Sequence, residues 1–236
     1  MKTIIQLLAE ELGCKEEYVN NVVTLLDEGN TIPFIARYRK EAHGAMDDTA
    51  LRTLETRLQY LRNLQQRRDE VKSAVEAQGK LTDELARSID NAATLAEVED
   101  LYRPYKQKRR TRATVAKEKG LEPLADAIFA QDRNGKAPEE LAKDFLNPDL
   151  GVETIEDALS GASDIIAERI SDDAELRKSL RARMQKSALC ESKAAKEDED
   201  SVYRLYYDFH QLVSKLQSHQ VLALNRGEKE GFLSVK

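Results

Sequence analysis

The fold of this chain follows from the stretch Leu51-Arg-Thr-Leu-Glu-Thr-Arg-Leu-Gln-Tyr-Leu-Arg-Asn-Leu64. Its leucines recur every three or four residues, and Val71 and Val75 continue the same pattern. This spacing places all of them on one face of an α-helix. Asp47 or Asp48 can cap its start and Gly79 can end it, which predicts one helix of about 30 residues, roughly 45 Å long.

The composition extends this prediction to the whole chain. Only 10 glycines and 5 prolines occur among 236 residues, and 34% of the residues are charged. Few helix breakers and many charged helix formers predict an all-α, elongated assembly of many helices. The net charge of -6 excludes a wholly basic nucleic-acid binder, so any such role must be local.

The two cysteines, Cys14 and Cys190, predict no disulfide framework, and no apolar run reaches the ~18–20 residues that span a bilayer. A cytoplasmic protein without membrane partners is therefore the expectation.

The order of helix and turn signals predicts four regions. Residues 1–80 hold a helix-turn-helix-like opening followed by the long helix, and residues 81–186 form a helical subdomain that includes a basic segment at 103–119. A polar linker follows at 187–200, with a short extended piece around Ala188 to Glu191. Residues 201–236 begin with an aromatic-rich helix over Val202 to Leu216 and end in a small extended element, while 221–225 fits either a helix or a strand.

The basic segment carries the strongest functional signal. Tyr102-Arg-Pro-Tyr-Lys-Gln-Lys-Arg-Arg-Thr-Arg-Ala-Thr-Val-Ala-Lys-Glu-Lys-Gly120 holds eight Lys or Arg residues against one Glu, in an acidic chain. Cations of this density neutralise phosphates, and aromatic rings among them can stack on bases. The candidate nucleic-acid-binding residues here are Lys106, Lys108, Arg109, Arg110, Arg112 and Lys117, with Tyr102 and Tyr105 as candidate stacking residues.

The same segment has an equally plain structural interpretation. Glu97, Glu99 and Asp100 lie directly upstream and could hold it as an internal clamp or interdomain docking element. A second group of candidates, Arg37, Arg39 and Lys40, lies on a helix predicted from Ile32 to Lys40, near the recognition position of a helix-turn-helix. The apolar Ile32, Phe34 and Ile35 favour a scaffold role for this helix instead.

Catalysis and metal binding find no support in the sequence. The three histidines are scattered, without the spacing of metal ligands, and no GxSxG, HExxH or phosphate-binding glycine loop is present. Carboxylate pairs such as Asp47-Asp48 are explained by helix capping. We therefore expect no enzyme activity, no cofactor and no metal.

Three motifs together resemble a known family. They are the basic segment, Thr31-Ile-Pro-Phe-Ile-Ala-Arg-Tyr-Arg-Lys-Glu41, and Ser218-His-Gln-Val-Leu-Ala-Leu-Asn-Arg-Gly-Glu-Lys-Glu-Gly231. In this order they resemble the amino-terminal region of the bacterial transcription accessory protein family Tex, over essentially the whole chain. The resemblance implies an RNase-H-like domain, helix-hairpin-helix elements and an RNA-binding OB-fold further on, so the chain is expected to be truncated relative to the family.

The resemblance implies a non-catalytic scaffold of a transcription-associated, nucleic-acid-binding protein. We expect this part to contribute a basic surface with weak, non-specific affinity for DNA or RNA, alongside the missing carboxy-terminal domains. The alternative is a protein-interaction module that docks on RNA polymerase or another transcription factor, with the long 47–78 helix as its platform. Salt dependence separates the two, because phosphate contacts weaken steeply with salt and apolar helix interfaces do not.

Overall fold

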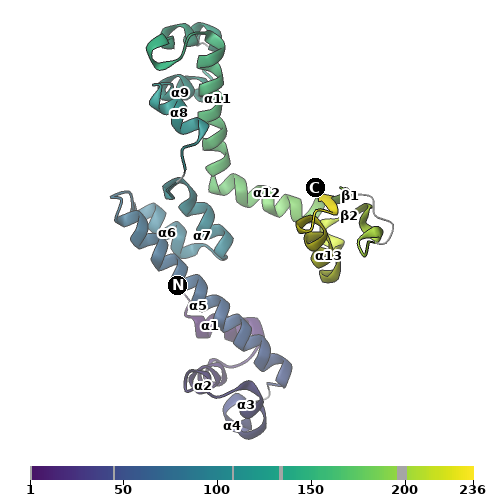
Figure 1. Ribbon diagram of the computed structural model, residues 1–236. Coiled ribbons are helices and arrows are strands. Elements are labelled where there is room, and N and C mark those ends of the chain that lie inside the picture. Colours follow the sequence, from purple (N-terminus) through teal and green to yellow (C-terminus); the bar gives the residue numbers. More distant parts are fainter. Residues whose placement is uncertain (1, 45, 108, 133–134, 196–200) are drawn as a thin grey trace. The chain divides into compact units, whose positions relative to one another are not determined.

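The structure, a computed structural model, describes the whole chain except residues 1, 45, 108, 133–134 and 196–200. It forms two compact units, Met1–Lys106 (unit 1) and Gln107–Lys236 (unit 2) (Figure 1). Helices dominate both units, and one small sheet lies near the carboxy terminus. The prediction of a helical assembly with a small extended element near that terminus is confirmed.

The regular secondary structure in the described residues of unit 1 is entirely helical. Its elements are α1 (Ile4–Leu12), α2 (Glu16–Asp27), α3 (Ile32–Tyr38), α4 (Lys40–His43), α5 (Asp48–Glu76), α6 (Asp83–Asn91), α7 (Leu95–Tyr102) and a 3-10 turn, η1 (Arg103–Tyr105). Helix α5 is the predicted long helix. The Asp47 side chain accepts a hydrogen bond from the backbone N–H of Ala50 and so caps its start.

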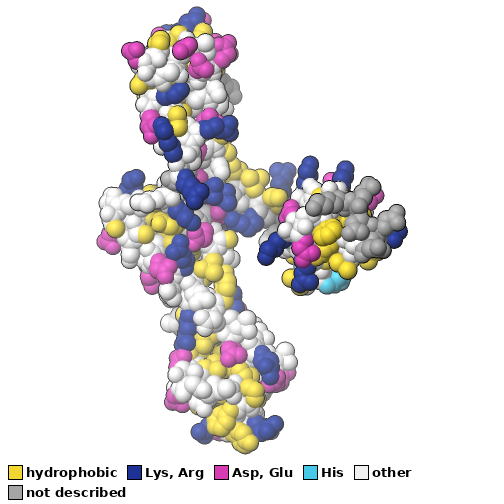
Figure 2. Space-filling view, viewed as in Figure 1, with side chains coloured by type: hydrophobic (Ala, Val, Ile, Leu, Met, Phe, Trp, Pro, Cys, Tyr) yellow, Lys and Arg dark blue, Asp and Glu magenta, His cyan; other side chains and the backbone are white. Residues whose placement is uncertain are grey.

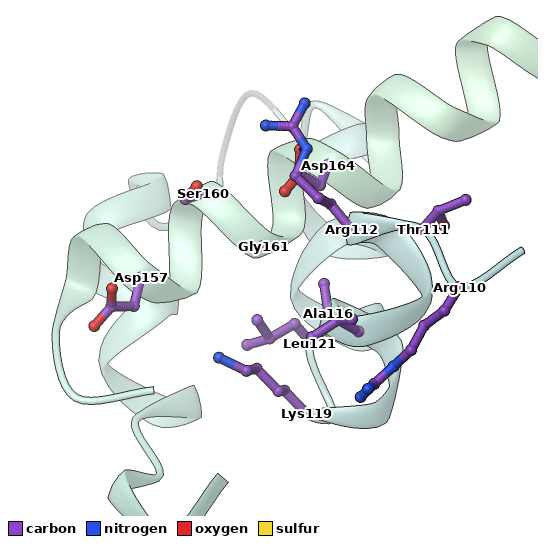
Figure 3. Close-up of a pocket in the computed structure, with 11 residues that line it drawn as sticks. Arg110, Thr111, Arg112, Ala116, Lys119, Leu121, Asp157, Ser160, Gly161 and Asp164 are labelled. Carbon is purple, nitrogen blue, oxygen red and sulfur yellow. The ribbon is translucent and has the colours of Figure 1, made fainter. Parts of the chain in front are cut away.

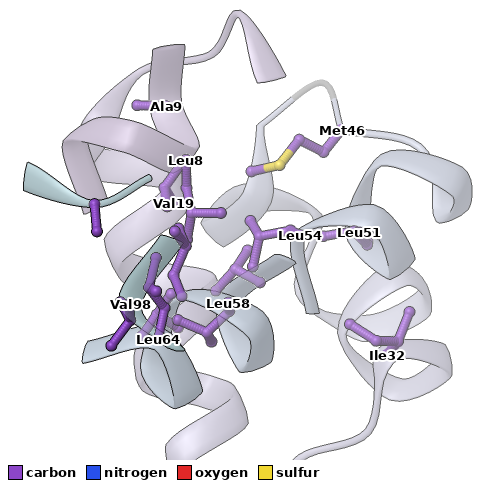
Figure 4. Close-up of a cluster of buried hydrophobic side chains, with 14 of the residues drawn as sticks. Leu8, Ala9, Val19, Ile32, Met46, Leu51, Leu54, Leu58, Leu64 and Val98 are labelled. Atoms are coloured by element: carbon purple, nitrogen blue, oxygen red, sulfur yellow. The ribbon is translucent and has the colours of Figure 1, made fainter. Parts of the chain in front are cut away.

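The apolar stripe of α5 forms the spine of the unit 1 core. All seven stripe residues are buried, from Leu51 to Val75. Figure 4 shows Leu54, Leu58 and Leu64 converging with Leu8 of α1 and Val19 of α2. The inward side of the opening helices therefore packs on α5.

Two arginines of α5 tie it to the opening helices. Arg57 donates to both carboxylate oxygens of Glu11 at 2.7 and 2.8 Å. Arg62 binds Asp27 in the same two-pronged way. The hydrogen bonds from these guanidinium groups lower the pKa of both carboxyls below their ordinary values.

Helices α6 and α7 pack on the same long helix. Ile89 and Val98 are fully buried, Lys72 contacts Asp90 at 2.7 Å, and Arg67 contacts Glu99 at 2.6 Å. Both groups of helices pack along α5, and the compact unit extends to Lys106.

The first part of unit 2 is a second helical core. It consists of α8 (Arg112–Glu118), α9 (Glu122–Ala130), α10 (Pro138–Ala142), the 3-10 turns η2 (Lys143–Phe145) and η3 (Pro148–Leu150), and α11 (Ile155–Asp172). Its buried residues are mostly alanines, with Leu121, Leu124 and Ile165 as the largest. Small residues let α8 and α11 approach closely.

Helix α12 (Ala174–Ser187) is capped by Asp173, whose carboxylate accepts a hydrogen bond from the backbone N–H of Leu176. None of its residues is buried, and hydrophobic side chains lie along its surface (Figure 2).

The sheet that follows has the order β2-β1-β3 and is antiparallel throughout. Its strands are β1 (Leu189–Ala194), β2 (Asp208–Leu212) and β3 (Leu233–Val235), with Ser192 paired to Phe209 on one side and to Val235 on the other. Helix α13 (Ser218–Lys229) packs on it and settles the ambiguity at 221–225 in favour of a helix.

The predicted helix over Val202 to Leu216 is wrong. These residues form two 3-10 turns, η4 (Arg204–Tyr206) and η5 (Val213–Lys215), on either side of β2. The hydroxyl of Ser192 donates to the carbonyl of Tyr206, and Tyr203 packs with Leu224 and Leu233. Partners distant in sequence thus override local helix propensity here.

The short extended piece expected around Ala188 to Glu191 is present, but it continues to Ala194, so the predicted linker at 187–200 is corrected in part. Residues 189–194 form β1, the central strand of the sheet, while residues 196–200 lie outside the described part of the chain. None of the described helices is both long enough and apolar enough to cross a membrane.

Candidate nucleic-acid interface

The two candidate stacking residues lie where the basic segment leaves unit 1. Tyr102 ends α7 and Tyr105 ends η1, and both are half-buried against the unit 1 core. The guanidinium of Arg67 lies 5.6 Å from the centre of the Tyr102 ring, and Gln78 donates to the backbone carbonyl of Tyr105. Both rings thus pack at the edge of the unit 1 core, and the guanidinium of Arg67 already covers one face of the Tyr102 ring.

The next cations are the most accessible ones. Lys106 and Arg109 are exposed, and among the residues that the structure describes neither side chain has a hydrogen-bond or ion-pair partner. Lys108, a third candidate, lies outside the described residues. The charges of Lys106 and Arg109 are therefore fully available to a ligand.

Helix α8 holds the following cations in place. Its N-cap, Thr111, accepts a hydrogen bond from the N–H of Thr114 and donates its own hydroxyl to Glu168 of α11 at 3.1 Å. The buried Ala113 and Ala116 face α11. The position of Arg110 and Arg112 at the start of α8 is therefore fixed by capping and by close helix packing.

Three of the candidates make ion pairs on the surface of unit 2. Arg110 contacts Glu118 at 2.6 Å, Arg112 contacts Asp164 at 3.6 Å, and Lys117 contacts Glu122 at 3.5 Å. The side chain of Arg112 is 89% exposed and that of Arg110 is 69% exposed. Solvent-exposed pairs of this kind contribute about 0–1 kcal/mol, so a phosphate can compete for these cations.

Two of the acidic residues expected to clamp the segment, Glu97 and Glu99, have partners within unit 1. Glu99 binds Arg67, and the carboxylate of Glu97 accepts from the backbone N–H of Ala93 at the start of its own helix. The pairs that Arg110, Arg112 and Lys117 form are with acidic residues of unit 2 instead.

Lys119 of the same segment has a clear structural role. Its ammonium group donates to the carbonyl of Gly151 at 2.7 Å and links the end of α8 to the turn after η3. No pattern in the sequence predicts this bond, because the two residues are 32 positions apart.

A shallow pocket between α8 and α11 brings cations and carboxylates together. Figure 3 shows Arg112 beside Asp164, while the ammonium of Lys119 points toward the side where Asp157 lies. Hydrogen bonds from Thr154 lower the pKa of the Asp157 carboxyl, which keeps it charged. A lining of both signs does not make a dedicated anion site, so the basic surface is better described by its exposed cations than by this pocket.

The second group of candidates lies in unit 1. Arg37 is on α3, Arg39 joins α3 to α4, and Lys40 begins α4; all three are exposed. Arg39 has a loose contact with Glu41 at 3.9 Å. The candidates of the sequence thus fall into two groups, one along the basic segment and one on α3 and α4.

The sequence grouped Phe34 with the apolar residues of a scaffold helix, but Phe34 and the nearby Tyr38 lie on its exposed side. Ile32 and Ile35 are buried, as a scaffold helix requires, but Phe34 and Tyr38 point outward and are 38% and 61% exposed. The signal was present in the spacing, because residues 32 and 35 share one helical face while residues 34 and 38 share another.

Two known protein families match the sequence of this chain. The family described as "Tex-like protein N-terminal domain" matches residues 2–76, and the one described as "Tex central region-like" matches residues 133–236. The matched stretches cover the long-helix core of unit 1 and most of unit 2. This chain belongs to the Tex family, as the three sequence motifs predicted.

Several relatives match the chain almost from end to end. Protein tex of Bordetella pertussis is 47% identical over 235 residues, which is 99% of this chain and 30% of that protein. Transcriptional accessory protein Tex of Neisseria gonorrhoeae is 42% identical over 98% of this chain and 30% of its own length. The human S1 RNA-binding domain-containing protein 1 is 30% identical over 99% of this chain and 24% of its own length. The chain therefore spans less than a third of these relatives.

Proposed function

We propose that this chain is a non-catalytic helical part of a transcription accessory protein of the Tex family, and that its basic segment contacts nucleic acid. The proposed contact residues are Lys106, Lys108, Arg109, Arg110, Arg112 and Lys117. The contact is with the phosphate backbone of DNA or RNA, so it is weak and independent of sequence. The names of the relatives, which refer to transcription and to an RNA-binding domain, support this role.

The observation that carries the proposal is the accessibility of the cations. Lys106 and Arg109 are exposed without partners in the described structure, and Arg110 and Arg112 have only solvent-exposed ones. An acidic chain would repel a polyanion elsewhere, so a local excess of cations directs binding to this segment.

The test is a four-residue variant, with Lys108, Arg109, Arg110 and Arg112 changed to Ala. Binding of a labelled oligonucleotide by the unmodified chain should have a Kd of about 10⁻⁴–10⁻⁶ M at physiological salt. The variant should flatten the dependence of log K on log salt by roughly the number of phosphate contacts removed. Its melting temperature should stay near that of the unmodified chain, because the ion pairs of Arg110 and Arg112 are exposed.

A charge-matched control separates this effect from net charge. Four exposed lysines elsewhere in unit 2 serve for it when changed to Ala: Lys136, Lys143, Lys215 and Lys229. The control should keep the salt slope. If the segment variant keeps its binding and loses thermal stability instead, the segment is a structural clamp and the proposal is wrong.

Docking on a transcription protein is a second candidate function, but it uses a different helix from the one expected. The apolar stripe of α5 is buried and cannot serve as a platform. Helix α12, in contrast, exposes Leu176, Leu180 and Met184, which follow each other at one-turn intervals. Binding of RNA polymerase that is lost in Leu180→Gln and insensitive to salt would favour this function.

A further inference from the structure

Helix α3 has an outer face with two neighbouring aromatic rings. The inner face is anchored by Ile32 and Ile35, which are 2% and 0% exposed. Phe34 and Tyr38 lie one turn apart on the other side, with their ring centroids 5.3 Å apart and their planes tilted by 46°. Because the buried isoleucines fix the helix, the two rings are held in a constant position at the surface.

Three exposed cations lie close to this aromatic pair along the chain. Arg37, Arg39 and Lys40 are exposed, and the single carboxylate on α3 and α4, that of Glu41, is 3.9 Å from Arg39. Figure 2 shows hydrophobic side chains with Lys and Arg beside them at the end of unit 1 that holds α3 and α4 in Figure 1. Helices α3 and α4 and the residue that joins them therefore carry more Lys and Arg than Asp and Glu, in a chain whose net charge is negative.

A pair of exposed rings with cations around it matches the chemistry of unpaired nucleotides. Base faces stack on aromatic side chains, and nearby Lys and Arg neutralise the phosphates between the bases. In a duplex the base faces are stacked on each other, so the rings would have nothing to bind. We infer that Phe34 and Tyr38 form a stacking site for the bases of single-stranded nucleic acid, with Arg37, Arg39 and Lys40 holding its backbone.

This site differs from duplex reading by a recognition helix. In a helix-turn-helix the amino-terminal residues of the recognition helix contact base edges in the major groove. Here that end carries the buried Ile32 and the proline Pro33, while the cations lie at the carboxy-terminal end of α3 and in α4. The helix therefore offers no polar side chains at the position that reads a duplex.

The chain contains no tryptophan, which gives a direct optical test. Tyr38→Trp introduces a single indole at the proposed site, and stacking of a base on it should quench its emission. The probe is oligouridylate of about 12 nucleotides, within the usual span of such sites. Saturable quenching by this probe, and by single-stranded DNA of equal length, is the expected result; a blunt-ended DNA duplex should leave the emission unchanged.

Phe129→Trp is the matched control, because Phe129 is 46% exposed in unit 2 and already has Arg169 over its ring. Its emission should not change with the probe. The second arm is the loss of affinity in Phe34→Ala and Tyr38→Ala, measured by fluorescence anisotropy of a labelled probe. Each change should weaken binding by at least about fivefold, since stacking on one ring contributes about 1–3 kcal/mol. Both rings are surface residues, so the melting temperature should remain unchanged.

The outcomes separate this site from the basic segment of unit 2. When Tyr38→Trp is combined with the four-residue variant of the segment, the indole should still be quenched although the salt slope is flattened. An absence of quenching together with unchanged affinity of the two Ala variants would overturn the stacking site and leave the basic segment unaffected. Equal quenching by the duplex would also overturn it, because the surface would then bind backbone and not bases. Emission that responds only to an added protein would assign the patch to a protein partner and end the proposal.

Discussion

The side chain of Leu121 packs directly against the backbone of Gly161, so that a β-carbon on that glycine would collide with it. Leu121 is only 1% exposed and has no room to move away, and Ala116 lies 3.3 Å from the same position. Gly161 thus determines how closely Ala116 of α8 and Leu121, at the start of α9, can approach α11.

We therefore expect Gly161→Ala to destabilise unit 2 by about 1–3 kcal/mol, as overpacking of a core does. In an exposed helix the same change would stabilise by about 0.5–1 kcal/mol, so the sign itself is diagnostic. Urea denaturation followed by circular dichroism measures it. Ser163→Ala, at an exposed position of the same helix, is the control and should have little effect. A stabilised Gly161→Ala variant would show that the two helices are not in contact at this point.

Leu58→Ala should cost about 2–5 kcal/mol of unfolding free energy, because Leu58 is 5% exposed and a cavity would remain in the unit 1 core. Gln59→Ala, on the solvent side of α5, should stay within about 0.5 kcal/mol of the unmodified chain. Chemical denaturation compares the two. Equal stabilities would mean that the stripe of α5 does not face a core.

The stability of unit 1 should fall as the solution is made acidic. Guanidinium hydrogen bonds lower the pKa of Glu11 and Asp27, so these carboxylates stabilise the fold above the ordinary carboxyl pKa of about 4. That contribution is lost as the pH falls through the lowered folded-state values. The Glu11→Gln variant should have a lower melting temperature at neutral pH, and its melting temperature should fall less steeply as the pH is lowered. Melting temperatures between neutral pH and pH of about 3 test this; an acid limb of unchanged steepness would contradict it.

Truncation of Lys119 should affect stability and truncation of Arg109 should affect nucleic-acid binding, although both residues belong to the basic segment. Lys119→Ala removes the hydrogen bond to the carbonyl of Gly151 and should lower the unfolding free energy by about 1–2 kcal/mol, with little change in nucleic-acid affinity. Arg109→Ala should leave stability within about 0.5 kcal/mol and reduce the salt slope of binding by about one contact. A loss of stability in Arg109→Ala would reveal an internal partner for that guanidinium.

Features that depend on local periodicity and capping could be predicted from the amino-acid order. The leucine spacing from Leu51 to Leu64 placed α5 correctly, because an apolar stripe at helical spacing has only one way to be buried. Asp47 marked the start of this helix in the same way. The order of the three sequence motifs was also sufficient to predict the family to which the chain belongs.

Features that depend on partners distant in sequence emerged only from the packed chain. The region from Val202 to Leu216 became a strand between two turns because it pairs with β1, whose own residues looked like a linker. The same holds for the candidate site. The charge of each cation was visible in the sequence, but whether it binds a carbonyl, as Lys119 does, or remains in solvent, as Arg109 does, depends on which backbone the fold brings near it. Likewise, only the burial of Ile32 and Ile35 turned Phe34 and Tyr38 outward together.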